Sequence, residues 1–323
     1  MKVVMLSNQC GPAVRLQVEG LRSLGVNVIP VIVDRARLGR WAYLDMRRLL
    51  KQQVDAIRPD IVHVQFGGVQ AAIAALAIPK RCIVSYHGTD LHGGSRSRSC
   101  FSRVSKRLGV WCSRFAIRHT AYSIVVSESL LKYIPADCGT VCTITTGVDY
   151  ECFKPLDRGS CLKDLGLDSA VPKVLFCDSS HDPVKRRDLA DVAIEKLRTA
   201  GIECELLELN NVCHEKVPLY LNASYCLLVT SDKEGSPNIV KEALACNIPV
   251  ISVDVGDVAD RIRNINGCYI CERDSVSLAK ALRQSLAGLG RCESRELVRS
   301  DIDNKIICKR LFTLYEAICG AKN

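Results

Sequence analysis

The chain has 323 residues, of which 48% are hydrophobic and 24% are charged, a composition that is typical of a folded globular protein and excludes a disordered one. This length is greater than that of a domain with one ordinary hydrophobic core, and it predicts two domains of about 150 residues each. Lys and Arg outnumber Asp and Glu by 44 to 35, which gives a formal net charge of +9, and the segment 95–118 is basic without one acidic residue. We expect an anionic partner at that segment.

The N-terminus has no secretory signal pattern, and no stretch of about 18 apolar residues occurs, so we expect a cytoplasmic protein without a membrane span. The 18 cysteines are scattered, and many lie inside apolar runs, as Cys82, Cys177 and Cys226 do. In a reducing compartment they act mostly as small buried apolar residues. The one C-x-x-C, Cys268 and Cys271, has no second pair at metal-site spacing, so a zinc site is disfavoured.

Short β-type runs alternate with longer helical patterns along the whole chain. Apolar runs between amphipathic helices are typical of parallel sheets that helices cover on both faces. Each half of the chain therefore predicts its own doubly wound, Rossmann-like α/β sheet. The expected strands lie at 3–7, 27–33, 60–65, 82–86, 122–127 and 141–146 in the first half, and at 173–177, 203–209, 225–231, 248–253 and 268–270 in the second.

The segment 147–161 interrupts this alternation with Pro155 and Gly159. We expect a first domain at 1–155, a second at 156–300, and a terminal helix within 301–323. One arrangement for this helix is to lie across both domains. Ligands of such sheets bind beyond the carboxyl ends of the strands, so the residues that follow the strands are the candidates for function.

The stretch 234–242, EGSPNIVKE, follows one of these strands and is suited to start a helix. Ser236 is a good N-cap, and Pro237 fits the first helical position. The amides of residues 238–240 would then point out of the helix N-terminus, where the macrodipole favours an anion such as a diphosphate.

Two carboxylates flank this helix start. Glu234 lies just outside it, and Glu242 lies in the second turn on the same face as Asn238. A sugar joined through a diphosphate to a ribose would supply both an anion and hydroxyl groups for these carboxylates. The alternative is a surface helix with a Ser-Pro start and two solvated glutamates.

The run 218–262, which contains this stretch, resembles the donor-binding region of the family 4 retaining glycosyltransferases, whose pattern is two glutamates separated by seven residues. The resemblance extends over nearly the whole chain, because five more segments fall in the order expected for such an enzyme: RPDIVHVQ, VSYHGTDL, SIVVSESLLKYI, TTGVDYECFKP and LFCDSSHDPVKRRDLA. It implies the GT-B fold, in which two Rossmann-like domains face a cleft and the last helix returns to the first domain.

The resemblance also implies a reaction. Such an enzyme moves a sugar from a UDP- or GDP-sugar to a sugar or lipid-linked acceptor with retention of configuration, in cell-surface glycan or polysaccharide synthesis. The family needs no covalent nucleophile, since the leaving diphosphate helps to take the acceptor proton, and we expect no metal or other cofactor. The one Asp-x-Asp, Asp301 and Asp303, lies away from every expected strand end, where a helix cap or a surface pair is its interpretation.

Roles for individual residues follow from the resemblance. Glu234 would contact the donor sugar, Glu242 the ribose hydroxyls, and Lys185 the diphosphate leaving group. His87, which follows the strand 82–86, would lie beside the donor sugar. Without the resemblance, a loop lysine is usually a solvated charge and a histidine after a strand is more often structural. The residues expected to present backbone amides to the donor are Gly235, Ser236, Pro237, Asn238 and Ile239.

Two positions depart from the family pattern. Ser179 stands where the family commonly has an arginine that helps to hold the diphosphate, and Arg186 or Arg187 is a hypothetical substitute for it. Thr146 replaces a common asparagine, which affects local turn hydrogen bonds more than chemistry. Gly11 lies in a strand-to-helix turn that borders the diphosphate or the acceptor in the family.

The basic segment 95–118 has apolar residues at helical spacing, among them Val104, Leu108 and Trp111, with basic residues between them. A basic amphipathic helix of this kind can lie on an anionic membrane surface. The alternative is a stripe that faces the core and a solvated basic face. Nucleic-acid binding is disfavoured, because no matching module or interleaved aromatic platform is present.

Two other functions stay open from the sequence. A GT-B nucleotide-sugar epimerase or hydrolase would need a general base in the cleft, and no paired acid and base motif stands out. A catalytically silent partner subunit would keep the fold without the reaction, and Ser179 is the best support for it.

Overall fold

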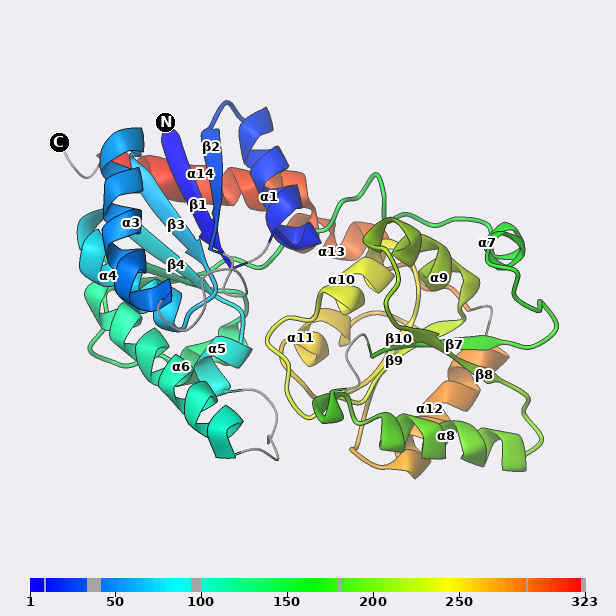
Figure 1. Ribbon diagram of the computed structural model, residues 1–323. Helices are drawn as coiled ribbons and strands as arrows, with labels where there is room; N and C mark the ends of the chain where they lie inside the picture. Colours follow the sequence, from blue (N-terminus) through cyan, green and yellow to red (C-terminus); the bar gives the residue numbers. More distant parts are fainter. Residues whose placement is uncertain (9, 34–41, 94–99, 179–181, 289, 321–323) are drawn as a thin grey trace. The chain divides into compact units, whose positions relative to one another are not determined.

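The computed structural model describes residues 1–8, 10–33, 42–93, 100–178, 182–288 and 290–320. They form two compact units (Figure 1). Unit 1 contains Met1–Gly147 and the C-terminal segment from Asn304, and unit 2 is Val148–Asp303. Each of the eleven strands expected from the sequence is present, within a few residues of its expected bounds.

Unit 1 is built on a six-stranded parallel sheet with the order β2-β1-β3-β4-β5-β6. In the register of its central pairs, Met5 of β1 lies opposite His63 of β3, and His63 lies opposite Ile83 of β4. The strands are β1 Lys2–Ser7, β2 Asn27–Ile32, β3 Ile61–Gln65, β4 Cys82–Tyr86, β5 Tyr122–Val125 and β6 Thr140–Thr143.

Helices cover both faces of this sheet, because successive residues of a strand point to opposite sides. Val4 and Leu6 of β1 pack in one core with residues of α3, α4 and α6, whereas Val3 and Met5 pack in another with residues of α1 and α14. The helices are α1 Pro12–Ser23, α3 Ala42–Ile57, α4 Val69–Ala77, α5 Thr89–His92, α6 Cys100–His119 and α14 Asn304–Gly320, and the 3-10 turns are η1 Pro79–Arg81 and η2 Glu128–Tyr133.

The C-terminal helix α14 belongs to unit 1, as the resemblance implied. Its residues Ile307, Cys308 and Leu311 are buried beside α1. A Cβ atom at Gly20 of α1 would lie 2.5 Å from Sγ of Cys308, so the close approach of the two helices requires glycine there.

Unit 2 has a five-stranded parallel sheet with the order β11-β10-β9-β7-β8. Its strands are β7 Lys173–Cys177, β8 Glu205–Leu209, β9 Cys226–Val229, β10 Val250–Val253 and β11 Tyr269–Cys271. The other elements are α7 Arg158–Asp164, η3 Pro183–Lys185, α8 Arg187–Thr199, η4 His214–Lys216, α9 Val217–Ala223, α10 Asn238–Ala245, α11 Val258–Ile262, α12 Ser275–Ala287 and α13 Arg295–Ile302.

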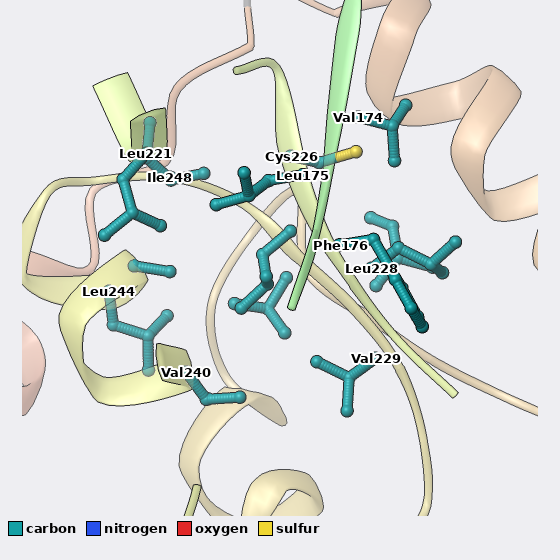
Figure 2. Close-up of a cluster of buried hydrophobic side chains, with 14 of the residues drawn as sticks. Val174, Leu175, Phe176, Leu221, Cys226, Leu228, Val229, Val240, Leu244 and Ile248 are labelled. Atoms are coloured by element: carbon teal, nitrogen blue, oxygen red, sulfur yellow. The ribbon is translucent and has the colours of Figure 1, made fainter. Parts of the chain in front are cut away.

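The core of unit 2 lies between this sheet and its helices. Figure 2 shows Leu175 of β7 and Leu228 of β9 among the side chains of this cluster, together with Val240 and Leu244 of α10. The apolar side of α10 therefore anchors the segment that begins at Glu234 against the centre of the sheet.

The boundary between the units lies earlier than the expected residue 155. Residues 148–155 pack with unit 2, because Val148 donates its amide to Ile302 and the guanidinium of Arg295 donates to the carbonyl of Tyr150. Phe153 is buried in the core of unit 2. The second crossing, between 303 and 304, comes three residues after the expected 300.

None of the described helices is both long enough and apolar enough to cross a membrane.

Candidate functional site

The helix start at 234–242 follows the central strand β9 of unit 2, as the sequence predicts. The expected cap is wrong by one residue. Pro237 is the N-cap with φ of −66°, α10 begins at Asn238, and no side chain caps the helix. The amide of Val240, one of the three expected to point out of the helix, donates instead to the carbonyl of Pro237 at 3.2 Å.

Lys185 and Glu234 form an ion pair, with 2.7 Å between Nζ and Oε1. Burial lowers the pKa of Lys185, but the charge and the hydrogen bond of Glu234 outweigh it and leave this pKa above its ordinary value. The η3 turn that ends at Lys185 is held by the residue after β9, because the hydroxyl of Thr230 donates to the carbonyl of Lys185 at 2.7 Å. Two residues of expected function that lie 49 positions apart therefore meet at neighbouring strand ends.

Arg186 and Arg187, the two hypothetical substitutes at the diphosphate, are both engaged with carboxylates. Arg186 donates to Asp188 at 2.9 Å and to Asp232 at 3.3 Å, and Arg187 pairs with Glu208. Both guanidinium charges are therefore already compensated by carboxylates of unit 2. Ser179 lies outside the described residues.

Glu242 is buried, and its Oε1 lies 2.9 Å from Nε2 of His214. This hydrogen bond raises the pKa of His214, against burial, and the negative charges of Glu242, Glu215 and Asp149 add to the effect. His214 belongs to the η4 turn that follows β8. His214 was not predicted from the sequence, although a histidine soon after a strand end is the same signal that indicated His87.

The loop after β10 packs against the turn before α10, which contains Glu234 and Gly235. Gly256 has φ of +62°, and a Cβ atom there would lie 2.7 Å from the carbonyl oxygen of Gly235. Lys241, on the buried side of α10, is inaccessible to solvent. Burial and the neighbouring Arg261 lower its pKa to about 7. The ends of four strands, β7 to β10, thus contribute to one region of unit 2.

In unit 1, His87 follows β4 as predicted, and its ring contacts that of Phe66 with 4.2 Å between the ring centroids and a tilt of 31°. Nε2 of His87 lies 3.3 Å from Oε1 of Gln65. Asp90, for which the sequence suggested no role, accepts hydrogen bonds from the amides of Gly67, His87 and Gly88 at 2.8 to 3.1 Å. Its carboxylate therefore ties the loop after β3 to the loop after β4.

Gln65 also belongs to a buried polar chain along β3. Its amide nitrogen donates to Oε1 of Gln17 at 2.6 Å. Two residues before it, Nδ1 of His63 lies 2.6 Å from the hydroxyl of Tyr315 on α14, and Nε2 lies 2.7 Å from the hydroxyl of Ser85. Burial, followed by the charge of His87, lowers the pKa of His63 to about 3 and keeps its ring neutral. The C-terminal helix and the surroundings of His87 are joined through this chain.

A hollow of about 370 Å³ adjoins this region of unit 1. The segments after β1 and β3, with the start of α5, form one wall, and the first half of α6 forms the other. The lining residues are Asn8, Phe66, Gly68, Thr89, Asp90, Ser105, Lys106, Gly109 and Val110. Gly11, near the same strand ends, is the N-cap of α1, and no described atom lies within 4 Å of the place where its Cβ would be.

The other features expected from the sequence are the Asp-x-Asp pair and the buried cysteines. Asp303 is buried and pairs with Arg299 at 3.3 Å, one turn earlier, and it is the C-cap of α13, which agrees with a helix cap. Cys82 and Cys226 are buried. Within the described ranges, no group of three or more His, Cys, Asp or Glu side chains is arranged to hold a metal ion.

Family models match both units. The model described as Glycosyltransferase Family 4 matches residues 2–151, and the model described as Glycosyl transferases group 1 matches residues 183–287, which include Lys185, His214, Glu234 and Glu242.

Curated relatives show a distant likeness. N-acetyl-alpha-D-glucosaminyl L-malate synthase of Bacillus anthracis is 26% identical over 243 residues, which are 66% of this chain and 61% of that protein. D-inositol 3-phosphate glycosyltransferase of Rhodococcus erythropolis is 26% identical over 170 residues, 43% of this chain and 38% of that protein. The match thus spans about three fifths of the first relative's length and about two fifths of the second's.

Solved structures share the fold over nearly the full length. Sucrose-phosphate synthase of Thermosynechococcus elongatus has a TM-score of 0.79 at 16% identity and covers 99% of this chain and 100% of its own. The Anabaena protein HepE in complex with UDP-glucose has a TM-score of 0.70 at 16% identity and covers 98% and 100%. Two parallel α/β units with these neighbours are the GT-B fold. With both units matched by the family's models, this chain belongs to the group 1 glycosyltransferases of family 4.

Proposed function

We propose that the protein transfers a sugar from a nucleotide-sugar donor to a sugar or lipid-linked acceptor, with retention of configuration, in the synthesis of a cell-surface glycan or polysaccharide. One observation carries the proposal. The family's two glutamates and its lysine lie at adjacent strand ends of unit 2, and each glutamate already has a cationic or titratable partner there: Lys185 for Glu234, and His214 for Glu242.

The donor is a UDP- or GDP-sugar. Solved relatives of this fold hold UDP and UDP-glucose, which supports a uridine nucleotide as the first probe. Glu242 accepts hydrogen bonds from the ribose hydroxyls. Its Oε1 faces His214, so Oε2 is the oxygen suited to this role. The start of α10 presents its first amides and the positive end of its dipole to the diphosphate.

Lys185 stabilises the charge that develops on the leaving diphosphate. It is paired with Glu234 in the free protein, so donor binding requires an exchange of partners in which the ammonium turns to the phosphate and Glu234 turns to hydroxyls of the sugar. A charged group held in place by burial and by Thr230 needs little reorganisation when the reaction occurs.

The transfer itself breaks the bond between the anomeric carbon and the diphosphate oxygen and forms a bond from the acceptor oxygen to the same face of that carbon. The acceptor hydroxyl gives its proton to the departing diphosphate, so no side chain has to serve as the base. The protein's part is to position both substrates and to stabilise the leaving group. His87, held by Gln65 and Phe66, is the group of unit 1 that we assign to the donor sugar.

The hollow of unit 1 is the acceptor site that we propose. It lies at the carboxyl ends of β1, β3 and β4, where ligands of doubly wound sheets bind, and Lys106 and Asn8 give it polar lining.

A panel of UDP- and GDP-sugars tests the donor site by thermal unfolding, because a ligand that binds only the native state raises the melting temperature. We expect one nucleotide sugar to stabilise the wild type, and Glu242→Ala to abolish most of that shift. Glu296→Ala, an exposed glutamate outside the site, is the control. No response to any sugar nucleotide would favour a catalytically silent subunit, and consumption of the donor without an acceptor would favour an epimerase or hydrolase.

A further inference from the structure

The outward face of α6 is apolar. Val104, Leu108 and Trp111 are 61%, 52% and 64% exposed, although they follow one another at the spacing of a single helix face. Phe115, half-buried, continues the row by one turn. We call these four residues the α6 stripe. The alternative from the sequence, a stripe that faces the core, is wrong.

Small residues decide which side of α6 faces the protein. Cys112, Ser113 and Ala116 are buried, and the helix packs there against α4 and α5 (Figure 1). The hydroxyl of Ser113 donates to the carbonyl of Asp90 and accepts from the amide of Gly68, which fixes the rotation of the helix. The stripe therefore stays on the outside in the folded unit.

The aromatic part of this face is ordered as a ladder. The rings of Trp111 and Phe115 stack with 6.0 Å between centroids, and the rings of Phe115 and His119 with 4.0 Å. Nδ1 of His119 lies 2.8 Å from the carbonyl oxygen of Phe115. A row of rings held in this way loses little conformational freedom when it enters an interface.

A row of arginines runs beside the stripe. With 100° per residue, Arg107, Arg114 and Arg118 lie on one flank of it, and all three are exposed. Arg118 pairs with Asp137 at 2.7 Å, so its charge is partly compensated. The helix itself contains no acidic residue.

From this arrangement we infer that the outward face of α6 docks on an anionic lipid surface, with the stripe in the headgroup and acyl boundary and Arg107 and Arg114 at the phosphates. The positive charge of the arginine row favours an anionic lipid surface as the partner. A basic row beside exposed tryptophan and aliphatic side chains is typical of helices that lie in a membrane interface. The inference does not rest on glycosyl transfer.

Docking in this way would bring the hollow of unit 1 close to the lipid. Lys106, Gly109 and Val110 line the hollow from the side of α6 that is turned away from the stripe. The hollow then lies about one helix diameter, roughly 10 Å, from the membrane surface. That position fits an acceptor whose lipid stays in the bilayer.

Vesicle binding tests the inference without any substrate. Full-length protein is sedimented with vesicles of phosphatidylcholine alone and of phosphatidylcholine with phosphatidylglycerol. We expect binding to the anionic vesicles only. Arg107→Gln with Arg114→Gln should lower the partition coefficient roughly 25-fold, since about five-fold is lost for each basic residue. Trp111→Ser with Leu108→Ser should lower it by about ten-fold or more.

Matched controls are Leu297→Ser, 64% exposed on α13, and Arg263→Gln, 71% exposed, and neither should change the binding. A Trp41→Phe variant leaves Trp111 as the one tryptophan of the chain, and its emission should shift to the blue on anionic vesicles. Circular dichroism checks that each variant is folded. The inference is overturned by equal binding to both vesicles, by binding to neither, or by a stripe-dependent dimer in solution that hides Trp111.

Discussion

Replacing Glu234 with Gln should strengthen the binding of a free nucleoside diphosphate while it weakens transfer. Oε1 of Glu234 holds Nζ of Lys185 at 2.7 Å, and the two side chains are only 17% and 27% exposed. A diphosphate therefore has to compete with Glu234 for this ammonium. Glutamine keeps the size of the side chain but removes the competing charge.

The size of the effect follows from the partial burial of this pair. A hydrogen bond to a charged group contributes about 1.5–3 kcal/mol, and an exposed ion pair contributes about 0–1 kcal/mol. The pair is neither fully buried nor exposed, so we take about 1 kcal/mol as the part that diphosphate binding has to overcome. That energy corresponds to roughly five-fold tighter binding of UDP or GDP. Transfer should fall about ten-fold or more, because the sugar loses a charged hydrogen-bond acceptor.

Isothermal titration of UDP and GDP, with transfer measured in parallel, checks both signs. Lys185→Ala should weaken nucleotide binding, and the double variant should bind no more tightly than Lys185→Ala, because no ammonium is left to release. Glu195→Gln, 70% exposed on α8, is the matched control. A loss of UDP affinity in Glu234→Gln as large as that in Lys185→Ala would refute the exchange of partners.

Three further predictions concern other contacts. The pKa of His214 is raised in the folded protein, so its bond to Glu242 adds stability below its ordinary pKa of 6.5 and loses it as the pH rises through the folded value. His214→Ala should therefore cost about 1 kcal/mol at pH 6, discounted for partial exposure, and little at pH 9, and a cost that does not vary with pH in thermal melts would contradict this. Gln65→Leu should lower the turnover of transfer by roughly ten- to hundred-fold, because His87 loses its hydrogen-bond partner and is displaced. The shift in melting temperature with UDP should stay unchanged, and a lost shift would instead indicate a damaged fold. Gly20→Ala should destabilise unit 1 by about 1–3 kcal/mol in thermal melts, because the new Cβ meets Cys308. Gly109→Ala in α6 has open space around the new Cβ, so it should instead stabilise the protein by up to about 1 kcal/mol in the same melts.

Much of the architecture was predictable because it depends on local periodicity. Alternation within β1 already divides Val3 and Met5 from Val4 and Leu6, and the structure places these pairs in two cores on opposite faces of the sheet. Continuous apolar runs such as 173–177 indicated strands buried on both sides, and β7 occupies those five residues. The spacing of Glu234 and Glu242 around a helix start is local too, although the helix begins at Asn238 rather than at Pro237.

Contacts between distant segments were decided by the tertiary structure. Lys185 meets Glu234, and His214 meets Glu242, because parallel strands bring their carboxyl ends to one edge of a sheet, and no spacing along the chain encodes which side chains then touch. The same holds for Tyr315, which reaches His63 across 252 residues.

The rotation of α6 shows the difference most plainly. Its sequence defines an apolar stripe and a side of small residues, and by hydrophobicity alone the stripe is the natural choice for the core. The structure buries the small side, because Ser113 has hydrogen-bond partners on Asp90 and Gly68 and because Cys112 and Ala116 allow close approach to the neighbouring helices. Periodicity determines that a helix has two faces, and the partners available in the fold determine which of them meets the solvent.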